Sequence, residues 1–367
     1  MRFRTDCGRS ALLASCSAVA LLIGGGAPVW AACTQVGAGG YNSGANVSGL
    51  CVSIPNAGSI LNGGTISRSG ITFTSGTMSG QIYSVGTING GISLDSHSAI
   101  IAGTNTSAAI HLLDANFSGG ISNAGTISAG YSAGILIFQL PTFSGGIANS
   151  GTISGQQYGI FIEGLTTFSG GISNSGSIAG GFAGVVVSEL TSFSNGISNS
   201  GTISSGGPAI FVGGYNNHPG VDAFSGGITN GSTGVISGSA GIFVDTVDSF
   251  SGGISNAGTI SAGFTGIAVT GVSNFSGGIT NSGGITANGA GIWLDGVATF
   301  TIGNISNSGT ISTAGTRAAI LIQQSTINGS ILDSGSILAS GAGISIDRKS
   351  TRLNSSHERR SRMPSSA

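Results

Sequence analysis

Isoleucine residues recur along this chain at a fixed phase within a unit of about 25 residues, separated by Gly, Ser, Asn and Thr. The unit is easiest to see where Phe-Ser-Gly-Gly-Ile or a near copy restarts, at intervals of 25 or 26 residues and once of 31. Self-similarity at this period is typical of stacked repeats, in which each unit buries its apolar side chains against its neighbours. The restarts are Phe117, Phe143, Phe168, Phe193, Phe224, Phe250, Phe275 and Phe300.

Each unit contains three short runs of alternating apolar and polar residues, separated by residues that form tight turns. In the unit that starts at Phe143 the runs are 146–149, 151–154 and 158–162, which are too short for helices. Three short strands per unit predict an all-β fold, a parallel β-helix (solenoid). The span 60–346 has room for roughly 11 coils of ~25 residues, stacked at about 4.8 Å per coil.

An Asn recurs at one phase, at the turn after the first run. Stacking would place each copy beside the next, and such amide ladders form where identical segments stack in register. We interpret these residues as a structural ladder rather than as ligand contacts: Asn123, Asn149, Asn174, Asn199, Asn230, Asn256, Asn281 and Asn307.

The middle residue of each third run is expected to point outward, which predicts an external apolar column. A column of that length needs a cover. The cover is either the chain's own turn, for example Leu165 and Phe168, or a partner protein or host surface. The column comprises Leu136, Phe161, Val186, Phe211, Phe243, Ala268, Trp293 and Leu321.

Residues 1–32 have the features of an export signal. Three Arg residues precede an apolar stretch at 11–23, and Ala31 and Ala32 supply small side chains for cleavage. A lipoprotein signal that is acylated at Cys33 is the alternative.

Only Cys33 and Cys51 remain after cleavage of that signal. We expect 33–59 to form an N-terminal cap in which these two residues form a disulfide, with two free thiols as the alternative. The repeat domain then covers 60–346.

The last residues, 347–367, lack the repeat pattern and carry six of the eleven Lys and Arg residues. The run from Asp347 to His357 resembles a translated sequencing adapter, so we interpret 347–367 as a non-native tail and expect the natural protein to continue beyond Ile346. A genuine basic tail is the alternative.

Without both ends, the chain is acidic. Between Cys33 and Ile346 the two cations, Arg68 and Arg317, face nine carboxylates, a net charge of −7. So few cations cannot neutralise a phosphate backbone, which excludes nucleic acid as a partner. No apolar run after the signal has the length of a membrane helix.

Carboxylates recur at the end of the third run, and we expect them to lie along one edge of the solenoid. Paired carboxylates at suitable separation could hydrolyse glycosides, as in β-helical polysaccharide lyases and hydrolases. Strand-end acids also commonly keep a sheet edge soluble, so we assign no catalytic residue. The weak candidates are Glu163, Glu189, Asp245 and Asp295, with Asp114 at the same end.

The 31-residue interval marks an insertion near 213–220. Extra residues in a solenoid form a surface loop, so Tyr215 and His218 are candidate binding residues, with an insertion that binds nothing as the alternative. No metal site is predicted, because His97 and His111 have no Cys or His at ligand spacing. No cofactor is predicted either, since no Gly-rich stretch leads into a helix.

The repeats themselves, for example Ser-Gly-Gly-Ile-Ser-Asn-Ala-Gly-Thr-Ile-Ser-Ala-Gly at 118–130, resemble the passenger region of bacterial autotransporters, the type V secretion family. The resemblance covers about 33–346. It implies export in a Gram-negative bacterium and display at the outer membrane, cell surface or outside the cell. The family inserts a C-terminal β-barrel, which this sequence lacks, so a membrane contact is expected only through such a barrel.

The leading functional hypothesis is a non-enzymatic adhesin or structural stalk. Its partner would be a protein or glycan on a host or neighbouring cell. The alternative is a secreted β-helical polysaccharide lyase or hydrolase that uses the strand-end carboxylates, and a third reading is a stalk that has lost its binding module. Whether the chain is an enzyme stays open, with the non-enzymatic reading preferred.

Overall fold

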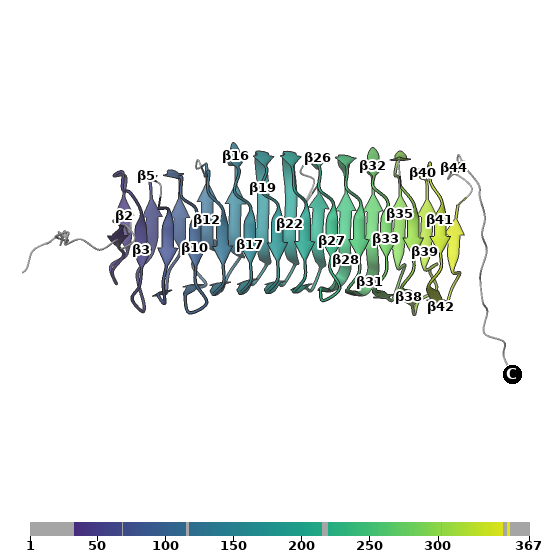
Figure 1. The fold of residues 1–367 in the computed structure, drawn as a ribbon, viewed down its shortest axis with the longest axis horizontal. Helices are drawn as coiled ribbons and strands as arrows, with labels where there is room; N and C mark the ends of the chain where they lie inside the picture. Colours follow the sequence, from purple (N-terminus) through teal and green to yellow (C-terminus); the bar gives the residue numbers. More distant parts are fainter. Residues whose placement is uncertain are drawn as a thin grey trace, which may run out of the picture. The chain divides into compact units, whose positions relative to one another are not determined.

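A computed structural model describes residues 33–67, 69–114, 117–214, 219–301 and 303–347, together with the backbone of 351–352. Over these ranges the chain is all-β and contains no helix. It forms a parallel β-solenoid of about 12 turns, as the repeat pattern predicts. Figure 1 shows the coils stacked along one axis in sequence order.

The first strand of each coil joins a continuous 13-stranded sheet with every neighbour parallel. Pairing starts inside the predicted cap, where Thr34 pairs with Leu50. The sheet contains β1 (Thr34–Gln35), β3 (Leu50–Val52), β6 (Ile71–Phe73), β10 (Ile92–Leu94), β13 (Ile121–Asn123), β17 (Ile147–Asn149), β20 (Ile172–Asn174), β23 (Ile197–Asn199), β27 (Ile228–Asn230), β30 (Ile254–Asn256), β33 (Ile279–Asn281), β37 (Ile305–Asn307) and β41 (Ile331–Asp333).

The second strand position follows a turn at the Asn. Its Ile residues face the interior and their neighbours face solvent, as in β14, where the burial alternates. It contains β7 (Thr77–Met78), β11 (Ala99–Ala102), β14 (Thr126–Ala129), β18 (Thr152–Gly155), β21 (Ser177–Gly180), β24 (Thr202–Ser205), the start of β28 (Val235–Asp245), the start of β31 (Thr259–Thr270), β34 (Gly284–Ala287), β38 (Thr310–Thr313) and β42 (Ser336–Ala339).

The third strand position is the longest in the middle coils. It contains β2 (Tyr41–Ser43), β4 (Ile60–Asn62), β8 (Ile82–Ser84), β12 (Ala108–Leu113), β15 (Ala133–Phe138), the starts of β19 (Tyr158–Phe168) and β22 (Ala183–Phe193), β25 (Pro208–Gly213), the ends of β28 and β31, β35 (Ile292–Asp295), β39 (Ile320–Gln323) and β43 (Ile344–Ile346).

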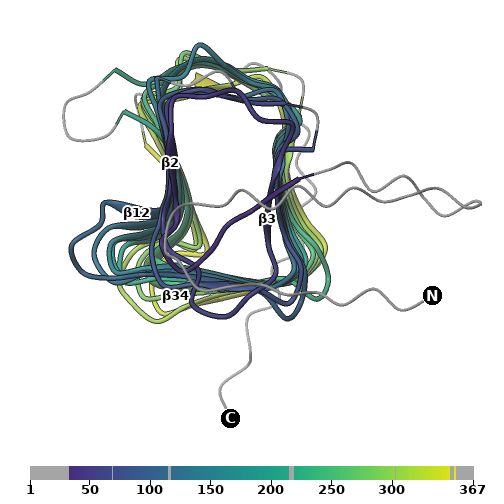
Figure 2. The same ribbon diagram turned by 90° about the vertical axis from the view of Figure 1, so that its left-hand side faces the viewer.

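A fourth strand position, which the sequence pattern did not predict, closes each coil. It contains β5 (Thr65–Ile66), β9 (Thr87–Ile88), β16 (Thr142–Phe143), the ends of β19 and β22, β26 (Val221–Phe224), β29 (Val247–Phe250), β32 (Asn274–Ser276), β36 (Thr299–Thr301), β40 (Thr326–Ile327) and β44 (Thr351–Arg352). The coil is therefore four-sided, and Figure 2 shows the coils superposed in that outline.

The Phe residues that mark the repeat lie inside the solenoid at this fourth position. Their rings stack from coil to coil with centroids 4.7–5.1 Å apart, and Phe143, Phe168 and Phe193 are fully buried. Burial of an aromatic ring removes a large apolar area from water, and these centroid distances lie in the range of favourable ring–ring contact. The stack together with the inward Ile columns forms one continuous core.

Candidate functional site

The outer face of the third strand position carries the external apolar column. In β19, Ile160 and Ile162 point into the core, while Phe161 and Glu163 alternate with them on the outside. Pairing in register brings Leu136, Phe161 and Val186 together on neighbouring coils. The column is half-buried at both ends and closed in the middle, where Val186 is fully buried.

The chain itself covers part of this column, but not with the residues predicted. Leu165 and Phe168 lie in the interior core, so the prediction that they cover the column was wrong. The cover comes from the corner between the second and third strand positions, which projects outward in Figure 2. There, the Tyr158 and Phe161 rings have centroids 4.6 Å apart. Both residues belong, with Phe211, to a small apolar cluster that is separate from the main core.

A pocket of about 420 Å³ lies where this cover is incomplete. It spans three coils, from β12 through β15 to β19, and ends before the fully buried Val186. Apolar and aromatic side chains form most of it, with one carboxyl group, Glu163, that is only 7% exposed. We call it the Glu163 pocket, and its lining residues are His111, Leu113, Ser132, Leu136, Phe138, Tyr158, Phe161 and Glu163.

His111 occupies the N-terminal side of the Glu163 pocket. Its Nδ1 lies 2.8 Å from the Ser107 hydroxyl, and its ring forms a T-shaped pair with the Tyr83 ring, with centroids 5.1 Å apart. Burial lowers the pKa of His111, because desolvation disfavours the charged imidazolium. The residue therefore adds no positive charge to the pocket at neutral pH.

The strand-end carboxylates lie in two adjacent columns at the same end of the third strand position. One column contains Glu163, Asp245 and Asp295, which end the third strand position. The next column contains Asp114 and Glu189, at the residue that follows, where φ is +47° and +53°. Asp245 and Asp295 are two coils apart, about 10 Å, and Glu163 is three coils from Asp245, about 14 Å.

The Thr270 hydroxyl, on the coil between Asp245 and Asp295, donates a hydrogen bond to Asp245. Asp245 also accepts a hydrogen bond from Thr246. Within the described ranges, no group of three or more His, Cys, Asp or Glu side chains is arranged to hold a metal ion.

The Asn residues form a buried ladder inside the first sheet. Each Nδ2 donates to the Oδ1 of the Asn on the next coil at 2.7–2.8 Å, from Asn123 to Asn307. Each Nδ2 also donates to backbone carbonyls of its own and the next turn, as Asn174 does to Gly176 and Thr202. The amide groups already form hydrogen bonds that hold the turns together, so they are not placed to bind a ligand.

The structure describes the predicted disulfide but not the candidate binding residues of the predicted loop. Cys33 and Cys51 are joined as a disulfide across the first two coils. The candidate binding residues Tyr215 and His218 lie outside the described residues, as do the predicted signal 1–32 and most of the tail. Within that tail, the backbone of β44 pairs in parallel with β40.

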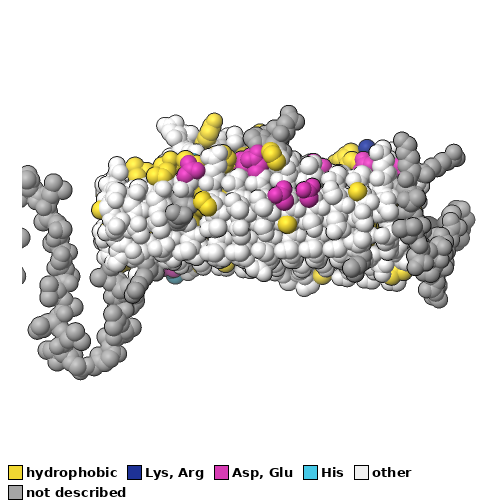
Figure 3. Space-filling view, turned by 90° about the horizontal axis from the view of Figure 1, so that it is seen from above, with side chains coloured by type: hydrophobic (Ala, Val, Ile, Leu, Met, Phe, Trp, Pro, Cys, Tyr) yellow, Lys and Arg dark blue, Asp and Glu magenta, His cyan; other side chains and the backbone are white. Residues whose placement is uncertain are grey.

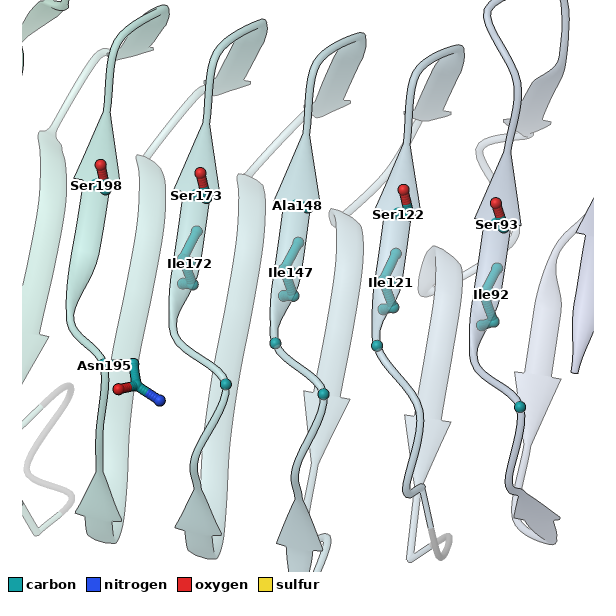
Figure 4. A pocket seen from close by; sticks show the side chains of 15 residues that line it. Ile92, Ser93, Ile121, Ser122, Ile147, Ala148, Ile172, Ser173, Asn195 and Ser198 are labelled. Atoms are coloured by element: carbon teal, nitrogen blue, oxygen red, sulfur yellow. The ribbon is translucent and has the colours of Figure 1, made fainter. Parts of the chain in front are cut away.

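A second hollow, of about 360 Å³, lies on the outer face of the first sheet. Figure 4 shows that its floor is a row of small side chains, one per coil: Ser93, Ser122, Ala148, Ser173 and Ser198. Gly residues of the adjoining turns complete it, and no charged side chain lines it. This hollow therefore lacks the chemical variety of the Glu163 pocket.

Sequence reasoning missed the pocket residues His111, Phe138 and Tyr158. The available signal was departure from the repeat: Tyr158 stands in register with Ala133 and Ala183, and Glu163 with Phe138 and Ser188. A residue that differs from its equivalents on the neighbouring coils is not required by the stacking, so such a departure can indicate another role.

Arg317 also departs from the repeat pattern, because it places a cation beside the apolar column. Its guanidinium lies 5.0 Å from the centre of the Phe264 ring and 5.3 Å from that of Trp293, which holds this cation against the C-terminal end of the apolar column.

No helix in the described ranges is long and apolar enough to cross a membrane. Comparison with protein-family models, curated proteins and solved structures gave no match.

Proposed function

We propose that this chain is an exported passenger similar to those of autotransporters, displayed at the cell surface, and that it acts as a non-enzymatic adhesin or stalk. The observation that carries the proposal is the outer face of the third strand position. There, the stacked coils carry an apolar column that is half-buried towards its ends, a pocket beside it, and exposed aromatic side chains at the adjoining corner. A rigid repeated surface is suited to binding, because little conformational entropy is lost when it meets a partner.

The partner would be a protein or glycan on a host or neighbouring cell. Three aromatic side chains, Tyr131, Phe182 and Phe264, are about half exposed along the projecting corner. Exposed aromatic side chains are enriched at protein–protein interfaces. Figure 3 shows that the neighbouring face is largely uncharged, with scattered carboxylates.

Deletion of the gene tests this proposal. We expect the deletion strain to lose binding to partner cells, and the full chain supplied on a plasmid to restore it. Protease treatment of intact cells should cleave the displayed chain. Unchanged cell binding after deletion, or complete protection from protease, would contradict the proposal.

The enzymatic alternative rests on Asp245 and Asp295, whose separation of about 10 Å lies near the upper limit for an inverting glycosidase pair. Changing Glu163, Glu189, Asp245 and Asp295 together to amides should leave polysaccharide turnover by the full chain unchanged. A loss of turnover in that variant, with the fold intact by circular dichroism, would favour the enzyme.

A further inference from the structure

Two exposed aromatic side chains lie at the projecting corner between the second and third strand positions (Figure 2). Tyr131 precedes β15 and is 53% exposed, and Phe182 precedes β22 and is 58% exposed. The strand register places one coil between them, so they are two coils apart, about 10 Å along the solenoid axis. The residues stacked below and above Phe182 are Gln157 and Gly207, so stacking does not require a ring there.

The corner between these two rings is polar and uncharged. Gln156 is exposed there, and its amide nitrogen donates to the backbone carbonyls of Gly130 at 3.0 Å and Tyr131 at 3.3 Å. Its carbonyl oxygen stays available as an acceptor. No acidic or basic residue occurs in the corner segments 129–133, 155–158 and 180–183.

Rings that alternate with an amide favour a carbohydrate over a protein. The centre of a protein interface is a contiguous, fully desolvated cluster of side chains, whereas the exposed Gln156 separates Tyr131 from Phe182. A sugar ring has C–H groups on its faces, which pack against aromatic faces, and hydroxyl groups at its rim, which need partners such as an amide. A neutral glycan fits best, because the corner has no cation to pair with an acidic one.

The spacing of the rings selects the geometry of that glycan. In an extended β-1,4-linked glycan each sugar advances by about one coil height and is flipped relative to the one before. Every second sugar therefore presents the same face, which matches rings two coils apart. Phe264 lies three coils beyond Phe182, and the Arg317 guanidinium lies over its ring at 5.0 Å, so Phe264 is outside this two-ring site.

We propose that the corner around Tyr131 and Phe182 binds a neutral, extended β-1,4-linked glycan. Two sugars of the same orientation stack on the two rings, and Gln156 hydrogen-bonds the sugar between them. This inference rests on the proposed function, because it names the partner of the displayed chain. Its test uses the purified full chain. Glycan binding can therefore fail while the deletion strain still loses adhesion, which rules out the glycan and not the display.

Oligosaccharides of defined length and linkage test the site on the unmodified full chain. Titration calorimetry or ligand-detected NMR compares cellotetraose, tetra-N-acetylchitotetraose, the disaccharide of each, and maltotetraose. We expect one or both of the β-linked tetrasaccharides to bind about 10-fold more tightly than the matching disaccharide, which cannot reach both rings. Maltotetraose should bind as weakly as a disaccharide, since its α-links curve the chain. No binding of either β-linked tetrasaccharide, or equal binding of maltotetraose, would overturn the proposal.

Two variants locate the site. Tyr131→Ala and Phe182→Ala should each weaken tetrasaccharide binding about 10-fold, to the level of the disaccharide. Phe264→Ala is the matched control, because it removes a similarly exposed ring from the same corner, outside the two-ring site. The thermal midpoint of each variant checks the fold. If Phe264→Ala weakened binding as much as Phe182→Ala, the glycan would not lie at this site. If Phe182→Ala abolished adhesion of cells while no glycan bound the chain, the partner would be a protein.

Discussion

At the scale of single residues, the Asn ladder has a direction. All of its amides donate toward the C-terminal end, where Asn307 Nδ2 donates to the Asp333 carboxylate at 2.7 Å. At the other end, Asn123 Oδ1 is buried and has no hydrogen-bond partner among the described residues, because Leu94 occupies the preceding position. Aligned amides polarise one another, and a carboxylate is the favourable acceptor for the last donor.

Breaking the ladder in its middle should cost more than shortening it at its start. Asn174→Leu removes the side-chain acceptor of Asn149 Nδ2, which keeps only backbone carbonyls, and leaves Asn199 Oδ1 without its donor. We expect this to cost about 2–4 kcal/mol, since a buried orphan group costs ~1–3 kcal/mol and the mutation removes several hydrogen bonds at once. Asn123→Leu only extends the apolar column that runs from Val52 through Phe73 to Leu94. Thermal unfolding measures both, and equal losses would show that the ladder is not cooperative.

At the scale of the elements, the turn after the third strand sets the coil's shape. The residue that follows the strand has positive φ on most coils, whatever its side chain: Asp114, Gln139, Gly164, Glu189, Thr246, Gly271, Gly296 and Gln324. Stacking forces this conformation, because the chain must turn at the same point on every coil. Non-glycine residues there are strained, Thr most of all because its β-carbon is branched.

Exchanging residues at this turn tests the strain directly. Thr246→Gly should stabilise the protein by about 0.5–1 kcal/mol, as relief of strain exceeds the entropy gained by the unfolded chain. Gly271→Thr, on the next coil, should destabilise it by about 1–2 kcal/mol. An added β-carbon at Gly271 would meet no atom closer than 3.6 Å, so only backbone strain opposes it. Opposite shifts in the unfolding midpoint are expected, and shifts of the same sign would contradict this account.

At the scale of the whole solenoid, the end coils are the weakest, since each has only one neighbour. In the last coil, Ile331, Ile337 and Ile346 are only partly buried against the core, and Leu338 is 59% exposed. The first coil is held differently, by the Cys33–Cys51 disulfide, which closes a loop with a sequence separation of 18.

Reducing the disulfide should loosen the first coils and leave the middle unchanged. A loop of this size contributes about 3 kcal/mol. Hydrogen exchange should therefore become faster in β1 to β4 after reduction, while β19 and β22 keep their protection. The double variant Cys33→Ser, Cys51→Ser should exchange in the same way with and without reductant. Faster exchange along the entire stack would mean that the coils unfold as one unit.

Several features of the fold were predictable because each coil repeats the one before it, shifted by one coil height along the solenoid axis. Moving by one coil brings residues of equal phase together, so the period of Ile147, Ile172 and Ile197 already implied a parallel solenoid with those residues in register. The same argument placed the Asn residues beside one another. The fourth strand position escaped prediction, because the two to four residues around each Phe are too few to show alternation.

By itself, then, the sequence determined the repeat, the coil and the columns, since these depend only on spacing along the chain. Only the tertiary structure decided that Phe168 faces inward, that Glu163 and Glu189 lie in different columns, and that Glu163 sits in an aromatic pocket. Those outcomes depend on how far each corner projects and which neighbouring coil it covers. Contacts of that kind involve residues from three coils at once, and a one-dimensional pattern does not contain them.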